Sequence, residues 1–308
     1  MSQNHSKGIY LALVTALISG VAIFVNKFAV DAIQPPLVFT AVKNVGVGLL
    51  IITILIITRK WRLIKKLTKR ESIYLVLIGI IGGSIPFYLY FTGLSQIPAI
   101  NAALIHKTLI FWVAILAILF LKEKLTRTQI VAVLLLFISN FFVGGFKGFQ
   151  FSNGELLILI ATIFWAVENI LAKKILPTVH PDIVTGARMG FGSIILLFAA
   201  AITAPSGLAK VTALNSTQLF WMILTMATLL GYIMSWYRAL KFAPAITVAS
   251  VLVTGTLVTN ILSAIFITHA LTVTMGIQAG LILVGIAIFY ISTKEISSHS
   301  IAKSEVSS

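Results

Sequence analysis

Long apolar segments alternate with short polar breaks along almost the whole chain. About ten of these segments approach 20 residues, the length at which an α-helix crosses the hydrocarbon core of a bilayer. Short segments of strict apolar and polar alternation, which a membrane β-barrel requires, are absent from the sequence. The pattern therefore predicts an all-α integral membrane protein. The predicted spans lie at roughly 8–30, 37–58, 73–94, 99–121, 127–146, 155–176, 181–204, 217–239, 245–268 and 272–293.

Composition and charge support this class. Of the 308 residues, 59% are hydrophobic and 10% are charged, which leaves too few polar side chains to cover a water-facing surface. The net charge of +15 comes from basic residues that fall mostly in alternate breaks, with the richest run, RKWRLIKKLTKR, at 59–70. The positive-inside rule places those breaks and both termini in the cytoplasm. The basic excess thus indicates topology and contact with anionic lipid headgroups, and no nucleic-acid partner is expected.

Signatures of enzymatic chemistry are absent from the sequence. The chain has no cysteine, which excludes disulfides and thiolate metal ligands. It has no H-E-x-x-H, P-loop or G-x-S-x-G motif, and its five histidines show no metal-ligand spacing. We therefore expect no enzyme activity, no metal and no cofactor.

The two halves of the chain resemble each other at a constant offset. LSQIPAINAA, starting at Leu94, aligns with LKFAPAITVA, starting at Leu240, and the same offset of 146 residues carries Lys27 onto Lys173. Because each half has an odd number of spans, the second half starts on the opposite side of the bilayer. Inverted repeats around a midplane site are typical of secondary transporters; the alternative is a duplication kept only for helix packing. We predict five-helix repeats over 1–146 and 147–293 and a disordered cytoplasmic tail over 294–308.

The order and spacing of the motifs resemble a known family. Each half has a basic residue in its second span, Lys43 in TAVKNVGVG and Arg188 in TGARMGFGS, and the first half closes with IPAINAALI and LFLKEKLT. In these features nearly the whole chain resembles the EamA branch of the drug/metabolite transporter superfamily. The resemblance implies a multipass inner-membrane carrier, often an exporter of amino acids or related small metabolites. It also implies that Glu123 closes the fourth helix of the first repeat, whereas the second repeat has His269 in that place.

Charges in the apolar spans mark the candidate site. Lys107 lies roughly 13 Å into a bilayer core about 30 Å thick, too deep for its side chain to reach water. A lysine facing lipid there costs at least about 3 kcal/mol, so it should face the interior, in a cavity or in a structural ion pair. Glu168 is the one acidic residue well inside a span, roughly 20 Å deep, where it faces a cavity or snorkels toward the cytoplasm. If both face one cavity, they hold a zwitterion between them, with His106 beside Lys107.

Further candidates surround these charges. Gly83 and Pro86, in IGGSIPFY, predict a kink that is either static or a hinge during transport. Lys43 and Arg188 lie about seven residues inside opposite faces of the membrane and are candidates for helix anchoring or gating. The predicted substrate-binding residues are Lys107, His106, Glu168, Trp165, Tyr88, Asn101 and Tyr237.

These features together predict a secondary active transporter in the inner membrane. It is expected to move small polar organic metabolites, with amino acids or their derivatives first among them, by alternating access and in the direction of export. The alternatives are a carrier of nucleotide-linked or cofactor-like metabolites, a channel, or a membrane subunit without transport activity. Protons, bound at Glu168, are the candidate coupling ion, membrane lipids are the expected surroundings, and the protein is expected to be a monomer or a homodimer.

Overall fold

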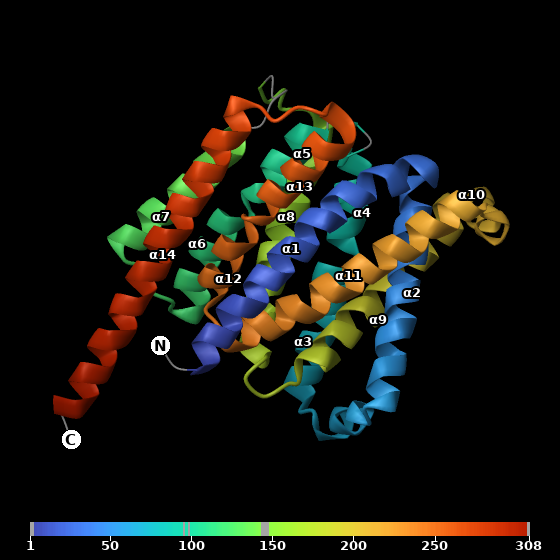
Figure 1. Ribbon diagram of the computed structural model, residues 1–308. Coiled ribbons are helices and arrows are strands. Elements are labelled where there is room, and N and C mark those ends of the chain that lie inside the picture. Colours follow the sequence, from blue (N-terminus) through green and yellow to red (C-terminus); the bar gives the residue numbers. More distant parts are fainter. Residues whose placement is uncertain (1–2, 95, 98, 143–147, 307–308) are drawn as a thin grey trace.

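Helices form the fold of the computed structural model, which describes residues 3–94, 96–97, 99–142 and 148–306 (Figure 1). No strand occurs among these residues. The first half contains α1 (Gln3–Ala32), α2 (Pro36–Ile57), η1 (Lys60–Lys66), α3 (Lys69–Gly83), α4 (Ile85–Leu94), α5 (Ala99–Lys107), α6 (Leu109–Leu121), α7 (Arg127–Ile138) and η2 (Ser139–Phe141). The second half contains α8 (Asn153–Ile175), α9 (Pro181–Thr203), α10 (Pro205–Ala209), η3 (Lys210–Ala213), α11 (Ser216–Phe242), α12 (Ala245–Leu252), α13 (Gly255–Ser263), η4 (Ala264–Thr268) and α14 (Val273–Val306).

Within the described residues, 8 helical segments are long and apolar enough to cross a membrane. They correspond to the first four predicted spans and to the sixth through ninth. The fifth and tenth predicted spans contain shorter apolar helices, at Arg127–Phe141 and Val273–Phe289, which pack against each other at one side of the bundle (Figure 1). The α14 backbone then stays helical to Val306, where the sequence predicts a disordered tail from 294, because no glycine or proline follows Gly285 to end the helix.

Local sequence sets the ends of the helices. Prolines occupy the first turn of α2 and α9, where a missing N–H leaves no hydrogen bond unmade. Four other helices begin with a capping box, in which two side chains satisfy backbone N–H groups reciprocally. These pairs are Thr68 with Glu71, Thr126 with Gln129, Ser152 with Glu155, and Asn215 with Gln218.

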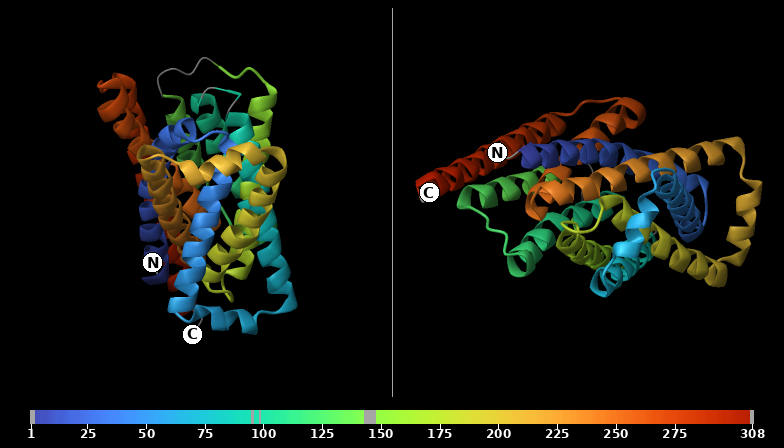
Figure 2. Two further views of the ribbon diagram at one scale, coloured as in Figure 1. Left: turned by 90° about the vertical axis from the view of Figure 1, so that its right-hand side faces the viewer. Right: turned by 90° about the horizontal axis from the view of Figure 1, so that it is seen from below.

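The two halves interlock around the centre of the bundle. α1 packs along α11 and α8 packs along α3 and α4, so the first helix of each half contacts the third span of the other (Figures 1 and 2). α2 packs on α9 in the same reciprocal way. Lys7 near the start of α1 lies 4.8 Å from the Phe242 ring centroid, and Lys173 near the end of α8 also bonds the end of α11. α1 and α8 therefore run in opposite directions. We name the two ends of the bundle the η1 end, which holds η1, and the α1–α2 end, where α1 passes into α2.

The fourth span of each half is broken at equivalent positions. α5 passes into α6 at Thr108, whose hydroxyl donates to the Ile105 carbonyl at 2.6 Å. α12 passes into α13 at Thr254, whose hydroxyl donates to the Val251 carbonyl at 2.9 Å. A hydroxyl that bonds a preceding carbonyl competes with the helix ladder and bends the helix. The two threonines are 146 residues apart, so the local geometry repeats with the sequence.

Candidate binding cavity between the repeats

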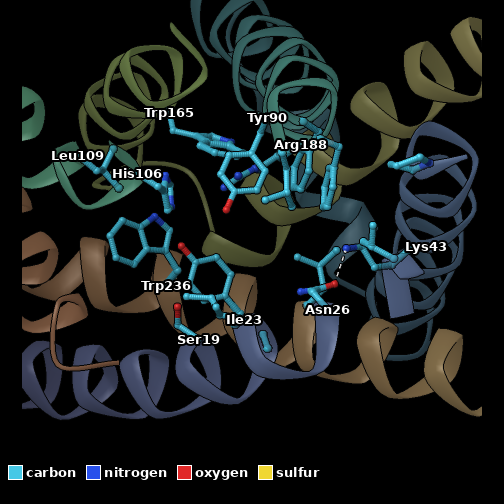
Figure 3. A pocket seen from close by; sticks show the side chains of 18 of the residues that line it. Ser19, Ile23, Asn26, Lys43, Tyr90, His106, Leu109, Trp165, Arg188 and Trp236 are labelled. Carbon is cyan, nitrogen blue, oxygen red and sulfur yellow. Dashed lines mark hydrogen bonds between the residues drawn. The ribbon is translucent and has the colours of Figure 1, made fainter. Parts of the chain in front are cut away.

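A cavity of about 590 Å³ lies between the two halves of the bundle (Figure 3). Its lining comes from α1, α2, α4, α5 and α6 of the first half and from α8, α9 and α11 of the second. The cavity reaches the α1–α2 end, where the exposed side chains of Asp31 and Gln34 line it. It ends inside the bundle at Glu168, Arg188 and Trp236. This volume is in the range of pockets that enclose small organic molecules.

Aromatic rings form much of the cavity wall. His106 contacts two of them, with its ring centroid 5.0 Å from that of Trp165 and 5.6 Å from that of Tyr90. The hydroxyl oxygen of Thr162 lies 3.5 Å from His106 Nδ1. The rings of His106, Trp165 and Tyr90 pack edge to face or tilted, the arrangements that aromatic pairs prefer. The aromatic lining residues are Phe87, Tyr90, Phe91, Trp165, Tyr232 and Trp236.

The third span is interrupted at Ser84, close to the cavity. Pro86 has no N–H to donate to the carbonyl of Gly82, four residues earlier. That carbonyl instead accepts hydrogen bonds from Trp165 Nε1 at 3.1 Å and from Arg188 Nε at 3.2 Å. The chain is thus kinked at IGGSIPFY, and the carbonyl freed by the proline joins α3 to α8 and α9. Movement at this kink stays a prediction.

Two glycines let three helices approach each other beside the kink. A Cβ on Gly82 would lie 2.2 Å from Cγ of Glu168, and a Cβ on Gly83 would lie 2.1 Å from the carbonyl oxygen of Arg188. Gly192 on α9 faces Gly83 in turn. Small residues at such crossings permit close backbone contact in membrane bundles.

Glu168 forms an ion pair with Arg188. Arg188 Nη1 lies 3.4 Å from Glu168 Oε2, and the Tyr237 hydroxyl donates to Glu168 Oε1 at 2.5 Å. Arg188 Nη1 also donates to the Tyr237 hydroxyl at 3.4 Å. All three side chains are buried. α8 and α9 are consecutive antiparallel helices, and both charges lie roughly 10 Å from the turn that joins them, so they meet at one depth.

Lys107 and His106 face different surroundings. His106 lines the cavity, whereas Lys107 does not. Lys107 ends α5 and is 7% exposed, and neither a hydrogen bond nor an ion pair joins it to another residue that the structure describes. Adjacent helix residues point about 100° apart, which explains why only one of the two reaches the cavity. Of the predicted zwitterion site, the structure places Glu168 at the cavity wall and Lys107 away from it.

Lys43 is the cation that enters the cavity from α2. Its ammonium donates to Asn26 Oδ1 at 3.0 Å and lies 4.6 Å and 5.3 Å from the ring centroids of Phe39 and Phe91. No carboxylate of the described residues lies within ion-pair distance of it. Figure 3 shows Lys43 and Asn26 at one side of the pocket, and His106 with Trp236 at the other.

The other predicted substrate-binding residues lie outside the cavity lining. Tyr88 is 43% exposed and borders a smaller surface pocket beside α2. Asn101 donates to Glu155 Oε1 at 2.8 Å and to the carbonyl of Gly148 at 3.0 Å, which ties α5 to the start of α8. Tyr237 lies behind the wall, where it contacts Glu168. In the other predicted set, Lys43 and Arg188 line the cavity, whereas Gly83 and Pro86 only adjoin it.

A polar layer closes the η1 end. The Lys173 ammonium donates to the carbonyls of Leu240 and Ala243, both at 2.6 Å, where α11 ends. The Glu123 carboxylate accepts hydrogen bonds from the first two N–H groups of α12, at 2.7 and 3.1 Å. Cations suit the C-terminal end of a helix and anions suit the N-terminal end, so both contacts follow the helix dipoles. We call these contacts of Lys173 and Glu123 the η1-end latch.

Asp182 completes the closure near the surface. It is buried and lies 2.7 Å from Lys60 Nζ and 2.5 Å from Arg238 Nη2, which joins η1, α9 and α11. His180 caps α9 by accepting from the Asp182 N–H at 3.2 Å. Partial burial lowers the pKa of His180, and the neighbouring Asp182 carboxylate acts in the opposite direction.

No motif in the sequence marks Asn26 or Lys173 as a site residue. Asn26 and Lys43 lie at similar distances from the turn between α1 and α2, as Glu168 and Arg188 do from the turn between α8 and α9. Pairing polar residues of equal depth across consecutive antiparallel helices is the signal that would have found both contacts. For Lys173 the available signal was its alignment with Lys27.

Comparison with known proteins identifies the family. A model of the EamA-like transporter family matches residues 6–145 and again residues 152–291. The chain belongs to the EamA-like transporter family. The two matches have the same 146-residue offset as the sequence motifs, so the protein consists of two EamA repeats. Family and helices together make it a multipass membrane protein, consistent with the plasma membrane, and they indicate a transporter rather than an enzyme.

Similar proteins support this assignment. An uncharacterized transporter of Synechocystis sp., sll1164, is 28% identical over 292 residues, which cover 86% of this chain and 80% of that protein. The uncharacterized transporters YyaM and YvbV of Bacillus subtilis are each 26% identical, over 204 and 269 residues, which cover 63% and 85% of this chain and 65% and 84% of theirs. A crystal structure of a protein with 14% sequence identity superposes with a TM-score of 0.78 over 95% of this chain and 99% of its own, and so shares the fold.

Proposed function

We propose that this EamA-family protein is a secondary active transporter of small polar organic metabolites, with amino acids or their derivatives first among them. The observation that carries the proposal is the cavity of about 590 Å³ between the two repeats, which reaches one end of the bundle while the η1-end latch closes the other. A carrier that works by alternating access needs such a cavity in each of two states, and related repeats supply the two states.

The charge distribution supports an orientation for this cavity. The basic run at 59–70 lies at the η1 end, and the positive-inside rule places that end in the cytoplasm. The cavity then faces the outside, and the conformation is the outward-facing one. Opening the latch while the α1–α2 end closes would expose the cavity to the cytoplasm, from which an exporter loads its cargo.

Glu168 is the group we propose for proton coupling. Its carboxylate is at the inner limit of the cavity and is shared by Arg188 and Tyr237. Protonation would remove the negative charge of Glu168 and break its ion pair with Arg188, which would change the charge at the inner limit of the cavity. Binding of the proton would thus be linked to binding of an anionic cargo through the charge of the cavity.

Counterflow in proteoliposomes tests this function. Vesicles loaded with a mixed pool of amino acids receive one labelled amino acid at a time, with and without a pH gradient, for the parent and for Glu168→Gln. Saturable uptake by the parent, with loss of the gradient effect in Glu168→Gln, is the expected result. Uptake of no amino acid by the folded parent would remove that substrate class, and flux that never saturates would favour a channel.

A further inference from the structure

We infer that Lys43 and Asn26 form a binding subsite for a single carboxylate, and that the cargo is a monoanion whose apolar or aromatic body lies against the rings of the cavity. This inference rests on the proposed carrier function and specifies its substrate class. It differs from the predicted zwitterion site in one decisive respect, because it requires the carboxylate of the cargo and does not require an ammonium group.

The charged side chains that line the cavity favour an anionic group on the cargo. Of the described residues that line it, Glu168 and Arg188 carry opposite charges and form an ion pair with each other. Asp31 is exposed at the mouth. Lys43 is 2% exposed, and its cavity contacts are an amide oxygen and two ring faces. These neutral groups stabilise an ammonium but do not neutralise it, and charges held in an apolar interior are costly unless they are paired. One anionic group on the cargo would complete this pairing.

The hydrogen-bond donors of Lys43 and Asn26 suit a carboxylate. Asn26 Oδ1 accepts a hydrogen bond from Lys43 Nζ. The other end of the Asn26 amide, its nitrogen, carries two N–H groups that can donate. The Lys43 ammonium has three N–H donors and uses one of them on Asn26. Both side chains line the cavity and stand together at one side of it (Figure 3). A carboxylate with its two oxygens can accept from the ammonium and from the amide at once.

The number of donors selects the kind of anion. Lys43, which pairs with no carboxylate of the described residues, and the neutral amide of Asn26 together match a single negative charge. Proteins recognise phosphate dianions with several charged or bidentate donors. Across the cavity from Lys43, the wall is aromatic, with Trp165 and Trp236 beside His106. The cavity therefore suits a small monocarboxylate with an apolar or aromatic body rather than a phosphorylated metabolite.

Binding measurements on the purified protein test this subsite directly. Trp165 and Trp236 line the cavity, so quenching of tryptophan fluorescence reports occupancy. The probes are 3-phenylpropanoate, its neutral amide, 3-phenylpropylamine, phenylalanine and phenyl phosphate. For the parent we expect 3-phenylpropanoate and phenylalanine to bind at least tenfold more tightly than the amide, the amine and the phosphate. In Lys43→Gln we expect the two carboxylates to lose at least tenfold in affinity, while the affinity for the amide changes less than twofold.

Two variants keep the result interpretable. Lys43→Met replaces the buried ammonium with an apolar group of similar length and is used where Lys43→Gln fails to fold. Lys210→Gln removes an exposed lysine at the same end of the bundle and should bind every probe as the parent does. Three results would each overturn the inference. The folded parent would bind the acid and its amide with equal affinity, it would bind none of the probes, or the Lys43 variants would bind the carboxylates as tightly as the parent does.

Counterflow of the same probes separates this inference from the proposed function. Saturable counterflow that is unchanged in the Lys43 variants would support the carrier function and reject the Lys43 subsite. Carboxylate binding that requires Lys43 in a protein that moves none of the probes would leave the subsite in place and reject carriage of this substrate class.

Discussion

The η1-end latch makes the strongest quantitative prediction about the conformational equilibrium. Lys173 donates two hydrogen bonds of 2.6 Å to carbonyls at the end of α11, and Lys173→Ala removes both. A hydrogen bond to a charged group contributes about 1.5–3 kcal/mol. Lys173 is partly exposed, and water replaces its two hydrogen bonds when the latch opens. We therefore apply the range for one such hydrogen bond to the two bonds together. Since about 1.4 kcal/mol corresponds to a factor of ten, the outward-facing state should lose about 10- to 150-fold in population relative to the inward-facing state.

Cysteine labelling measures this shift cleanly, because the chain has no native cysteine. Ala22→Cys places a reporter in the cavity, and Ser206→Cys places one on the exposed surface of the α1–α2 end. A membrane-impermeant maleimide is added outside right-side-out vesicles. In the Lys173→Ala background, labelling at position 22 should slow several-fold, while labelling at position 206 should stay the same.

Lys174→Ala is the matched control for this experiment. Lys174 is the next residue along α8, and its ammonium lies over the Phe120 ring, 5.4 Å from the centroid. Its loss should leave labelling at position 22 within about twofold of the parent, since exposed single contacts contribute little. Labelling in folded Lys173→Ala at the rate of the parent would refute the reasoning that this contact holds the η1 end closed.

Two further predictions concern the cluster around Glu168, and thermal unfolding in lipid nanodiscs measures both. Gly82→Ala places a Cβ 2.2 Å from Glu168 Cγ and should cost about 1–3 kcal/mol, whereas Gly190→Ala, with no atom within 4 Å of its Cβ, should be neutral or stabilising by about 0.5–1 kcal/mol. Equal effects of the two substitutions would show that the close approach of α8 to α3 is not limiting. Arg188→Met leaves Glu168 buried without its ion partner and should cost about 3–5 kcal/mol, and adding Glu168→Gln should restore at least half of that loss. A double variant less stable than Arg188→Met alone would contradict the pairing.

Depth in the membrane could be predicted from the sequence, but the direction in which a side chain points around its helix could not. The length of an apolar segment sets where each residue lies along the bundle axis, which is why the spans, the repeats and the kink at Pro86 could be found. In a soluble helix the polar face then shows which side is buried. In a membrane helix both faces are apolar: in α2, Val47 is 0% exposed and Leu49 is 62% exposed, and their residue types do not distinguish them.

The placement of Lys107 and Glu168 illustrates this limit. Counting residues along each span predicted how deep the two side chains lie in the membrane, and both side chains are buried. The neighbour that each side chain contacts depends on how its helix is rotated and where it crosses other helices, and only the packed structure shows this. At Glu168, the kink frees the Gly82 carbonyl, Arg188 donates to that carbonyl, and the same guanidinium forms an ion pair with Glu168. Consecutive antiparallel helices are the exception, since equal distance from their shared turn restricts the partners enough to be useful.

The repeat offers one last test, because it assigns a counterpart to the latch. The 146-residue offset relates Lys173 to Lys27 and relates the carbonyls of Leu240 and Ala243 to those of Leu94 and Ile97. If the two repeats exchange conformations during transport, Lys27 should bond these two carbonyls in the inward-facing state and close the α1–α2 end. Lys27→Ala should therefore destabilise the inward-facing state and speed labelling at position 22, opposite in sign to Lys173→Ala, and the double variant should label at a rate between the two. Slower labelling in both single variants would mean that the two lysines do not exchange roles, and the alternating-access proposal would lose the symmetry on which it depends.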